Sequence, residues 1–263
     1  MTQDVGTGDS SERPIRLGGA LITMVEPHRG REVAYNRWYE RDHFYAGCMI
    51  GAWTIQGSRY VATRDLKALR YPKNSPICPD PTGGSYIAIY WILAGRLAEW
   101  IRWGTDQVRW LHEHGRMFAD RDHVHTAMYR FQTEYRARPD GIPIELALDH
   151  HSPYLVFAIG RPRGGRTLDE VDGFLRTRAL GEVAAAFAPV PLLGDAPIDV
   201  PREDDSDRFA LLSFVDAEIG DVWGSTFENL GRDLAARDVA DLLFVSPFRK
   251  TIVGTDAYTD RLW

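Results

Sequence analysis

The order of apolar and polar positions predicts an alternation of strands and helices that runs twice along the chain. Short apolar runs alternate with longer stretches in which apolar residues recur at helical spacing. In the first half this pattern predicts the order strand, helix, strand, strand, helix, strand at residues 17–25, 31–48, 54–64, 85–93, 96–117 and 122–135. A proline-rich segment at residues 72–82 is expected to form a loop.

The second half is expected to repeat this order of elements. Its predicted strand, helix, strand, strand, helix and strand lie at residues 154–159, 168–187, 190–193, 208–215, 221–237 and 240–252. The halves share little residue identity, so the repeat rests on element order. We therefore expect a disordered tail at residues 1–14, a first unit at 15–136, a linker at 137–152 and a second unit at 153–263.

This element order predicts the fold. A βαββαβ unit forms a four-stranded antiparallel sheet with both helices on one face, and it leaves the other face apolar and uncovered. Two such sheets that cover one another close into a barrel-like sandwich. The sequence therefore predicts an α+β protein in which two tandem ferredoxin-like units form a dimeric-α/β-barrel-type architecture. We expect the covered sheets to leave a hollow that polar side chains of the first helix can reach.

The second helix of the first half, residues 96–117, has two adjacent apolar stripes, which is wider than one sheet surface requires. The stripes consist of Leu97, Ile101, Val108 and Leu111, and of Trp100, Trp103 and Trp110. The extra aromatic face must meet the other half, a partner chain or a pocket. Core or interface is the favoured interpretation, which is consistent with a homodimer, and Trp103 is a candidate substrate-binding residue.

Composition and charge exclude several classes of function. The formal charge is −6 and there is no run of Lys and Arg interleaved with aromatics, so nucleic-acid binding is not expected. The two cysteines form no CxxC, which fits a reducing compartment. The longest apolar run, residues 86–95, is about half the length of a membrane-spanning helix. The first residues do not resemble a signal peptide, so a cytoplasmic location is expected.

The first helix carries a polar ridge that is a candidate site. Tyr39 and His43 are four residues apart, so they project from one helical face, and Asn36 lies one turn before Tyr39. If the ridge meets a cavity, His43 can act as general base or acid, with Tyr39 as a second proton donor and Asn36 orienting a carbonyl. Trp38 beside the ridge is a candidate substrate-binding residue. The alternative is that the ridge caps the sheet edge and bonds to backbone.

Residues 36–43, with the sequence Asn-Arg-Trp-Tyr-Glu-Arg-Asp-His, resemble the EthD-like and related dimeric α/β-barrel proteins. In these proteins a first helix often carries Asn-x-Trp-Tyr, an acidic residue and a His. The resemblance covers residues 17–135, and residues 254–260 show a second, partial similarity to such proteins. Tyr45 stands where such proteins often have proline, so the helix is expected to continue further. The superfamily includes cofactor-free monooxygenases, polyketide cyclases, degradation-pathway proteins and haem-binding branches, so the resemblance constrains fold better than reaction.

Two further positions on strands are candidates for substrate binding. His123 and His125 are two apart, so they are expected to share a strand face with Tyr129, and His125 and Tyr129 are pocket candidates. A partly solvated strand end is the alternative. Arg59 on the second strand, if buried, needs an anionic partner, which would be a substrate carboxylate or Asp42. A surface arginine is an equal alternative.

Two histidine-rich tracts are candidates for metal or haem binding. His123-x-His125 and Asp149-His150-His151 are short ligand-rich segments, but no third ligand at fixed spacing accompanies them. The sequence therefore predicts no metal site and no cofactor. Haem ligation by one of these histidines stays open, because the superfamily that the chain resembles has haem-binding branches.

The leading hypothesis from these residues is an enzyme for a hydrophobic aromatic or polyketide-like molecule. The substrate is expected to bind in an apolar cavity between sheet and helices and to react by cofactor-independent acid/base chemistry of the cyclase, isomerase or monooxygenase type. Burial is expected to lower the pKa of His43 and keep it neutral. The alternatives are a non-catalytic ligand-binding or homodimeric interaction protein, and a haem-binding member of the same superfamily.

Overall fold

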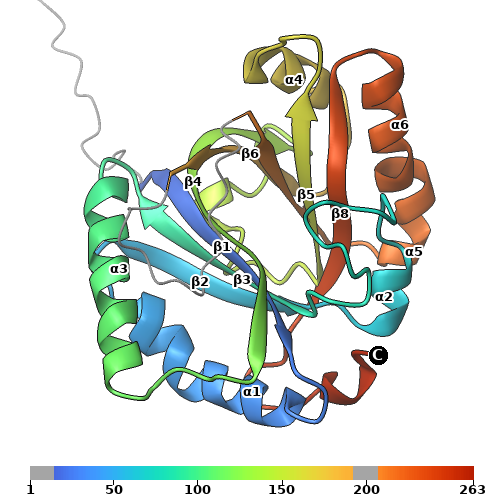
Figure 1. Ribbon diagram of the computed structural model, residues 1–263. Helices are drawn as coiled ribbons and strands as arrows, with labels where there is room; N and C mark the ends of the chain where they lie inside the picture. The colour runs from blue at the N-terminus through green and yellow to red at the C-terminus, as the bar shows by residue number, and fades with distance from the viewer. Residues whose placement is uncertain (1–14, 192–206) are drawn as a thin grey trace, which may run out of the picture.

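The computed structural model describes residues 15–191 and 207–263, so the expected tail at 1–14 lies outside the described residues. The described part of the first half contains helical segments and strands, most of which are labelled in Figure 1. These are β1 (Leu17–Pro27), α1 (Glu32–Trp38), the π-helix η1 (Tyr39–Met49), β2 (Thr54–Val61), α2 (Arg64–Ala68), β3 (Tyr86–Leu93), α3 (Leu97–Glu113), β4 (Arg121–Arg136) and, in the linker, the 3-10 turn η2 (Ile144–Leu146).

The second half supplies the remaining strands of the same sheet. Its elements are β5 (Tyr154–Pro162), α4 (Leu168–Leu175), β6 (Val183–Val190), β7 (Phe209–Val215), α5 (Ile219–Val222), the π-helix η3 (Trp223–Phe227), α6 (Glu228–Ala236), β8 (Ala240–Lys250) and the 3-10 turn η4 (Thr259–Arg261). Within the described residues, no helix is both long and apolar enough to cross a membrane.

The strands close into one antiparallel barrel with the order β1-β3-β2-β8-β5-β7-β6-β4. Each half contributes four adjacent strands, and the helices lie outside the barrel (Figure 1). The two halves meet at a long seam between β4 and β6 and at a short seam between β2 and β8, where only Tyr60–Lys250 and Val61–Arg249 are paired. The predicted α+β class and the closure of two four-stranded sheets into a barrel are confirmed.

The helix predicted at residues 168–187 is wrong beyond Leu175, because Val183–Val190 is strand β6. Its alanines favour a helix by intrinsic propensity. They pair instead with β4 on one side and β7 on the other, so sheet pairing overrides propensity. The strand predicted at 190–193 is displaced accordingly, and its last two positions lie outside the described residues. The helix predicted at 221–237 consists of α5, η3 and α6 in succession.

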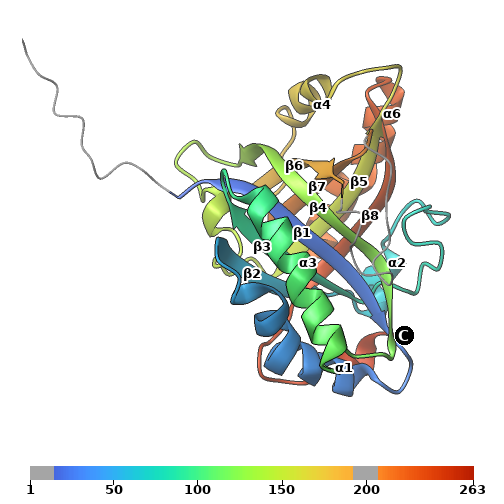
Figure 2. The ribbon, with the colours of Figure 1, turned by 60° about the vertical axis from the view of Figure 1, so that its left-hand side comes forward.

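Large side chains fill the interior of the barrel. Alternate residues of the first-half strands point inward. There they meet side chains of the second-half strands in one cluster of almost completely buried residues, which includes Trp91, Tyr129, Phe157, Phe187 and Phe214. The expected hollow between the two covered sheets is therefore wrong, because aromatic rings occupy that space. The other face of the first-half sheet packs against α1, η1 and α3, and Figure 2 shows α3 lying along this outer face.

Candidate functional site

A pocket of about 110 Å³ lies between the outer face of the first-half sheet and the helices η1 and α3; we call it the sheet–helix pocket. Its walls are mostly apolar, with Leu21, Met128, Trp100, Ile101 and Val108 among them. An engineered apolar cavity of about 150 Å³ binds benzene, whereas drug-sized ligands occupy pockets of about 300–1,000 Å³. The closed part of this pocket therefore matches one aromatic ring.

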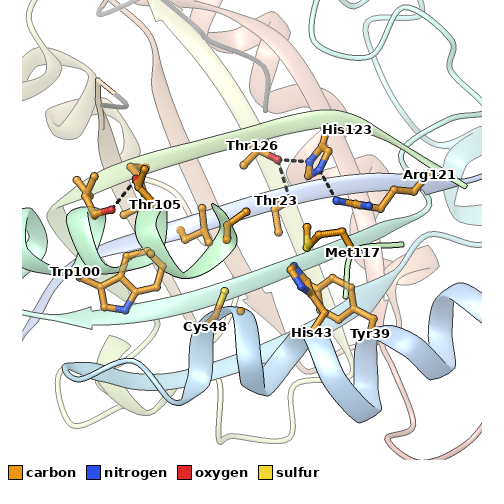
Figure 3. Close-up of a pocket in the computed structure, with 16 residues that line it drawn as sticks. Thr23, Tyr39, His43, Cys48, Trp100, Thr105, Met117, Arg121, His123 and Thr126 are labelled. Atoms are coloured by element: carbon orange, nitrogen blue, oxygen red, sulfur yellow. Dashed lines mark hydrogen bonds between the residues drawn. The ribbon is translucent and has the colours of Figure 1, made fainter. Parts of the chain in front are cut away.

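His43 projects from η1 into the wall of this pocket (Figure 3). Its ring stacks on Trp38 with centroids 4.5 Å apart and meets the edge of Tyr39 at 5.2 Å. Gly47 one turn later makes room for the ring, since a Cβ there would lie 2.9 Å from Cε1 of His43. Nδ1 of His43 is buried and has no hydrogen-bond partner among the described residues.

The imidazole of His43 is neutral in this environment. Burial, followed by the positive charge of Arg121 and by His123, lowers the pKa of His43 to about 3, and Asp42 opposes the shift only in part. A buried polar atom without a partner costs about 1–3 kcal/mol, so such atoms are uncommon in proteins. The pocket wall therefore contains a neutral imidazole whose Nδ1 has no hydrogen-bond partner among the described residues.

Tyr39 lines the pocket, but its hydroxyl is already engaged. It lies 2.9 Å from the hydroxyl of Tyr90, and burial raises the pKa of both tyrosines far above the usual value. Tyr39 is therefore a poor proton donor, and its ring serves as a wall beside His43. Burial also raises the pKa of the Cys48 thiol in the same wall to about 12, so this thiol stays protonated.

Asn36 and Arg59 lie in a separate buried cluster that does not line the pocket. Asn36 donates to the carbonyl of Thr255 at 2.9 Å and accepts from Arg59 Nη1 at 3.1 Å. The anionic partner of Arg59 is Glu40 at 3.4 Å, and its guanidinium covers the ring of Tyr39 at 4.3 Å. The cluster therefore packs against Tyr39 without lining the pocket.

The expectation that Asp42 pairs with Arg59 is wrong. Asp42 forms its ion pair with Arg116, on the segment that follows α3. Residues 40 and 42 are two apart on a helix, so they point in different directions, and only Glu40 turns toward the buried Arg59.

His123 and His125 do not share a strand face, contrary to the expectation from their spacing. The register between β1 and β4 shifts there, so that Met24 faces His125 whereas Val25 faces His123. The extra residue in β4 turns His123 outward to the pocket and leaves His125 in the barrel. His125 is fully buried, lies 3.0 Å from the hydroxyl of Tyr129 and packs on Phe157. His125 and Tyr129 are therefore core residues and do not line the pocket.

The two candidate tryptophans lie behind the pocket wall. Trp38 covers one face of His43 and donates from Nε1 to the carbonyl of Arg116 at 2.9 Å. Trp103 packs on Trp100 and over Gly51, where a Cβ would lie 2.3 Å from Cζ3 of Trp103. Of the tryptophan stripe of α3, only Trp100 lines the pocket.

Sequence reasoning missed a polar edge made by Thr23 on β1 and by Arg121, His123 and Thr126 at the start of β4. Figure 3 shows this edge above η1 as a chain of hydrogen bonds. Arg121 Nη2 lies 3.3 Å from Nε2 of His123, Nδ1 of His123 lies 2.9 Å from Oγ1 of Thr126, and the hydroxyls of Thr126 and Thr23 are 2.8 Å apart. Polar residues within otherwise apolar strands were the available signal, but the register shift hid the position of His123.

The residues that line the sheet–helix pocket do not fit a metal or a haem. The described residues contain no group of three or more His, Cys, Asp or Glu side chains that could hold a metal ion. The sheet–helix pocket has the volume of one ring, which is too small for a macrocycle. The second half, residues 153–263, has no His, Cys or Met in its sequence that could serve as an axial ligand.

Comparison with known proteins shows the fold. No family model matches the chain, and no curated protein matches it. A presumed chlorite dismutase of known structure matches with a TM-score of 0.50 and 13% identity over 94% of this chain and 100% of that chain. This chain has a dimeric α/β-barrel fold, with both sheets in one polypeptide. At this identity the likeness concerns the fold alone.

Two further solved structures show weaker likeness. A presumed monooxygenase from Fusobacterium nucleatum subsp. nucleatum matches with a TM-score of 0.49 and 9% identity, over 90% of this chain and 94% of that chain. An anthrone oxidase-like protein matches with a TM-score of 0.48 and 9% identity, over 92% of this chain and 98% of that chain.

Proposed function

We propose that the protein binds a small apolar molecule with one aromatic ring in the sheet–helix pocket and acts on it by cofactor-independent acid/base chemistry. One observation carries the proposal: His43 presents a neutral imidazole, with Nδ1 unpartnered among the described residues, in the wall of a mostly apolar pocket. A buried polar group that costs stability is typical of a functional site. The resemblance of residues 36–43, which include His43, to EthD-like proteins supports this proposal.

The chemistry that we infer is reversible proton abstraction from an enolisable or phenolic molecule. The lone pair of the His43 imidazole takes a proton from carbon or oxygen, the ligand becomes an enolate or phenolate, and the imidazolium returns the proton to another atom. Arg121 lines the same pocket, and its positive charge stabilises the anion that forms. Burial lowers the pKa of His43, so the imidazole stays neutral near pH 7 and its lone pair is available to accept a proton.

A second candidate function is non-catalytic binding in the same pocket. It is favoured by the hydrogen bonds of Tyr39 and Asn36, because both side chains are used within the protein and not offered to a ligand. The homodimer expected from the sequence stays a prediction.

Methionine methyl resonances test whether the pocket binds a ring. Met117 and Met128 line the pocket, whereas Met24 lies in the barrel core. In protein labelled with ¹³C at the methionine methyl groups, we expect phenol to shift the signals of Met117 and Met128 and to leave Met24 unchanged.

A pocket-filling variant provides the control. Val108 lines the pocket and Val33 is exposed on α1, so Val108→Phe and Val33→Phe make the same change in two places. We expect Val108→Phe to abolish the phenol-dependent shifts and Val33→Phe to preserve them. Shifts that survive Val108→Phe, or no shifts in the unmodified protein, would contradict the proposal.

A further inference from the structure

Thr23 and Thr126 line the sheet–helix pocket, and a count of hydrogens shows that one of their two hydroxyl groups has a hydrogen to spare. Arginine only donates, so Nε2 of His123 accepts from Arg121. A neutral imidazole with an accepting Nε2 carries its hydrogen on Nδ1. The 2.9 Å contact of Nδ1 with Thr126 is therefore a bond that His123 donates to the threonine hydroxyl.

The two hydroxyls then hold two hydrogens, and the bond between them uses one. Thr23 and Thr126 are 2.8 Å apart, and either can be the donor of that bond. Neither hydroxyl has another acceptor among the described residues, and both line the pocket. Whichever way the bond runs, one hydroxyl hydrogen is left to point elsewhere. Both side chains are more than nine-tenths buried, so bulk water is a poor acceptor for it.

We propose that this remaining hydroxyl hydrogen binds a carbonyl oxygen of the ligand, so that the pocket selects small aryl carbonyl compounds over hydrocarbons of the same shape. The inference rests on the proposed function and names its substrate class. The pair lies on the strands and His43 on the helix across the pocket (Figure 3), so oxygen and acidic hydrogen would be held from opposite walls. Thr23 and Thr126 are specificity-determining residues, and His123 and Arg121 are positioning residues that orient the pair.

Two ligands of one shape test this selection. Acetophenone and α-methylstyrene differ by an oxygen in place of a methylene group, and their affinities are compared by the methionine methyl shifts. We expect the unmodified protein to bind acetophenone roughly 3- to 10-fold more tightly, as for one neutral hydrogen bond. In the variant Thr23→Val/Thr126→Val this ratio should fall to about 1, and Thr23→Ser/Thr126→Ser should restore it.

Thr105 offers a matched control in the same pocket. Its hydroxyl already donates to the carbonyl of Ile101 at 2.9 Å, so Thr105→Val should leave the ratio unchanged. Equal affinities in the unmodified protein, or an equal loss in Thr105→Val, would overturn the inference and leave the proposed function standing. Binding of neither ligand would overturn the proposed function itself.

A measurement without variants guards against misfolding of the double variant. The carbonyl stretch of bound ¹³C-labelled acetophenone should lie at lower frequency than in an apolar solvent, because a donated hydrogen bond weakens the carbonyl bond. ¹⁵N resonances of His123 should show hydrogen on Nδ1 and none on Nε2. An unshifted stretch, or hydrogen on Nε2 alone, would refute the assignment.

Discussion

At the residue scale, His43 is placed where it costs the protein stability. Its ring is held by stacking on Trp38 and by the space that Gly47 leaves, while Nδ1 receives no hydrogen bond from the described residues. Tyr39 next to it is the opposite case, because its hydroxyl is paired with that of Tyr90. Two neighbouring polar side chains therefore have opposite effects on the free energy of unfolding.

Replacing each of these two side chains should change the free energy of unfolding in opposite directions. We expect His43→Leu to keep or raise the free energy of unfolding by about 1 kcal/mol, because it removes an unpaired buried polar atom. Tyr39→Phe should lower it by about 1 kcal/mol, because it leaves the Tyr90 hydroxyl unpaired. Urea unfolding at pH 7 measures both. A strong loss of stability in His43→Leu would mean that the imidazole is structural.

The pH dependence of stability follows from the same histidine. The pKa of His43 is about 3 in the folded protein and about 6.5 in an unfolded chain, so the folded state binds fewer protons between these values. The free energy of unfolding is therefore highest above about pH 6.5 and decreases as the pH falls toward 3. Between pH 7 and pH 4 we expect the protein to lose on the order of 2–3 kcal/mol more than His43→Leu. Parallel pH curves for the two proteins would contradict this.

At the element scale, the π-helix η1 and the register shift of β4 build the pocket. η1 brings His43 against Gly47, and the shift in β4 turns His123 to the same pocket. π-Helical segments and β-bulges are both frequent at functional sites. The two irregular elements therefore face each other across the pocket.

Two glycine substitutions in helices test the role of η1. Gly173 in α4 has open space where a Cβ would lie, so Gly173→Ala should raise the free energy of unfolding by about 0.4–1 kcal/mol. Gly47→Ala gains the same propensity but must displace the His43 ring. We expect it to raise stability less or to lower it, and to weaken phenol binding. Equal gains at both sites, with phenol binding intact, would show that the ring is not held there.

The sequence predicts the regular elements of this fold better than its irregular ones. Strands β1 to β4 follow from apolar runs bounded by glycine and proline, and α3 follows from its helical spacing. β6 was missed because its alanines have helical propensity and its strand character depends on neighbours on both sides. One inserted residue in β4 leaves no mark in composition, yet it places His123 and His125 on opposite faces of the sheet.

At the scale of the whole molecule, the C-terminal segment ties the second half to the first helix. After β8 the chain returns to α1 and ends beside α2 (Figure 1). The carbonyl of Thr255 accepts from Asn36, the amide of Gly254 donates to Glu40, and the carbonyl of Leu262 accepts from Lys67. The role of Asn36 could not be predicted from the helix, because its partner is 219 residues away in the sequence.

A substitution of Asn36 should therefore act on stability and not on ligand binding. We expect Asn36→Leu to lower the free energy of unfolding by about 1–3 kcal/mol, because it leaves Arg59 and the Thr255 carbonyl without this partner. Phenol should still shift the methyl signals of Met117 and Met128 in the folded variant. Loss of phenol binding without loss of stability would instead place Asn36 in the site.

Proton exchange at a ligand carbon tests the central claim most directly. In D₂O, the protein with acetophenone should incorporate deuterium at the methyl carbon faster than buffer alone, as followed by NMR. His43→Leu should reduce the rate to that of buffer while acetophenone still binds. Acetophenone that binds without exchange in the unmodified protein, or exchange that persists in His43→Leu, would contradict proton transfer by His43.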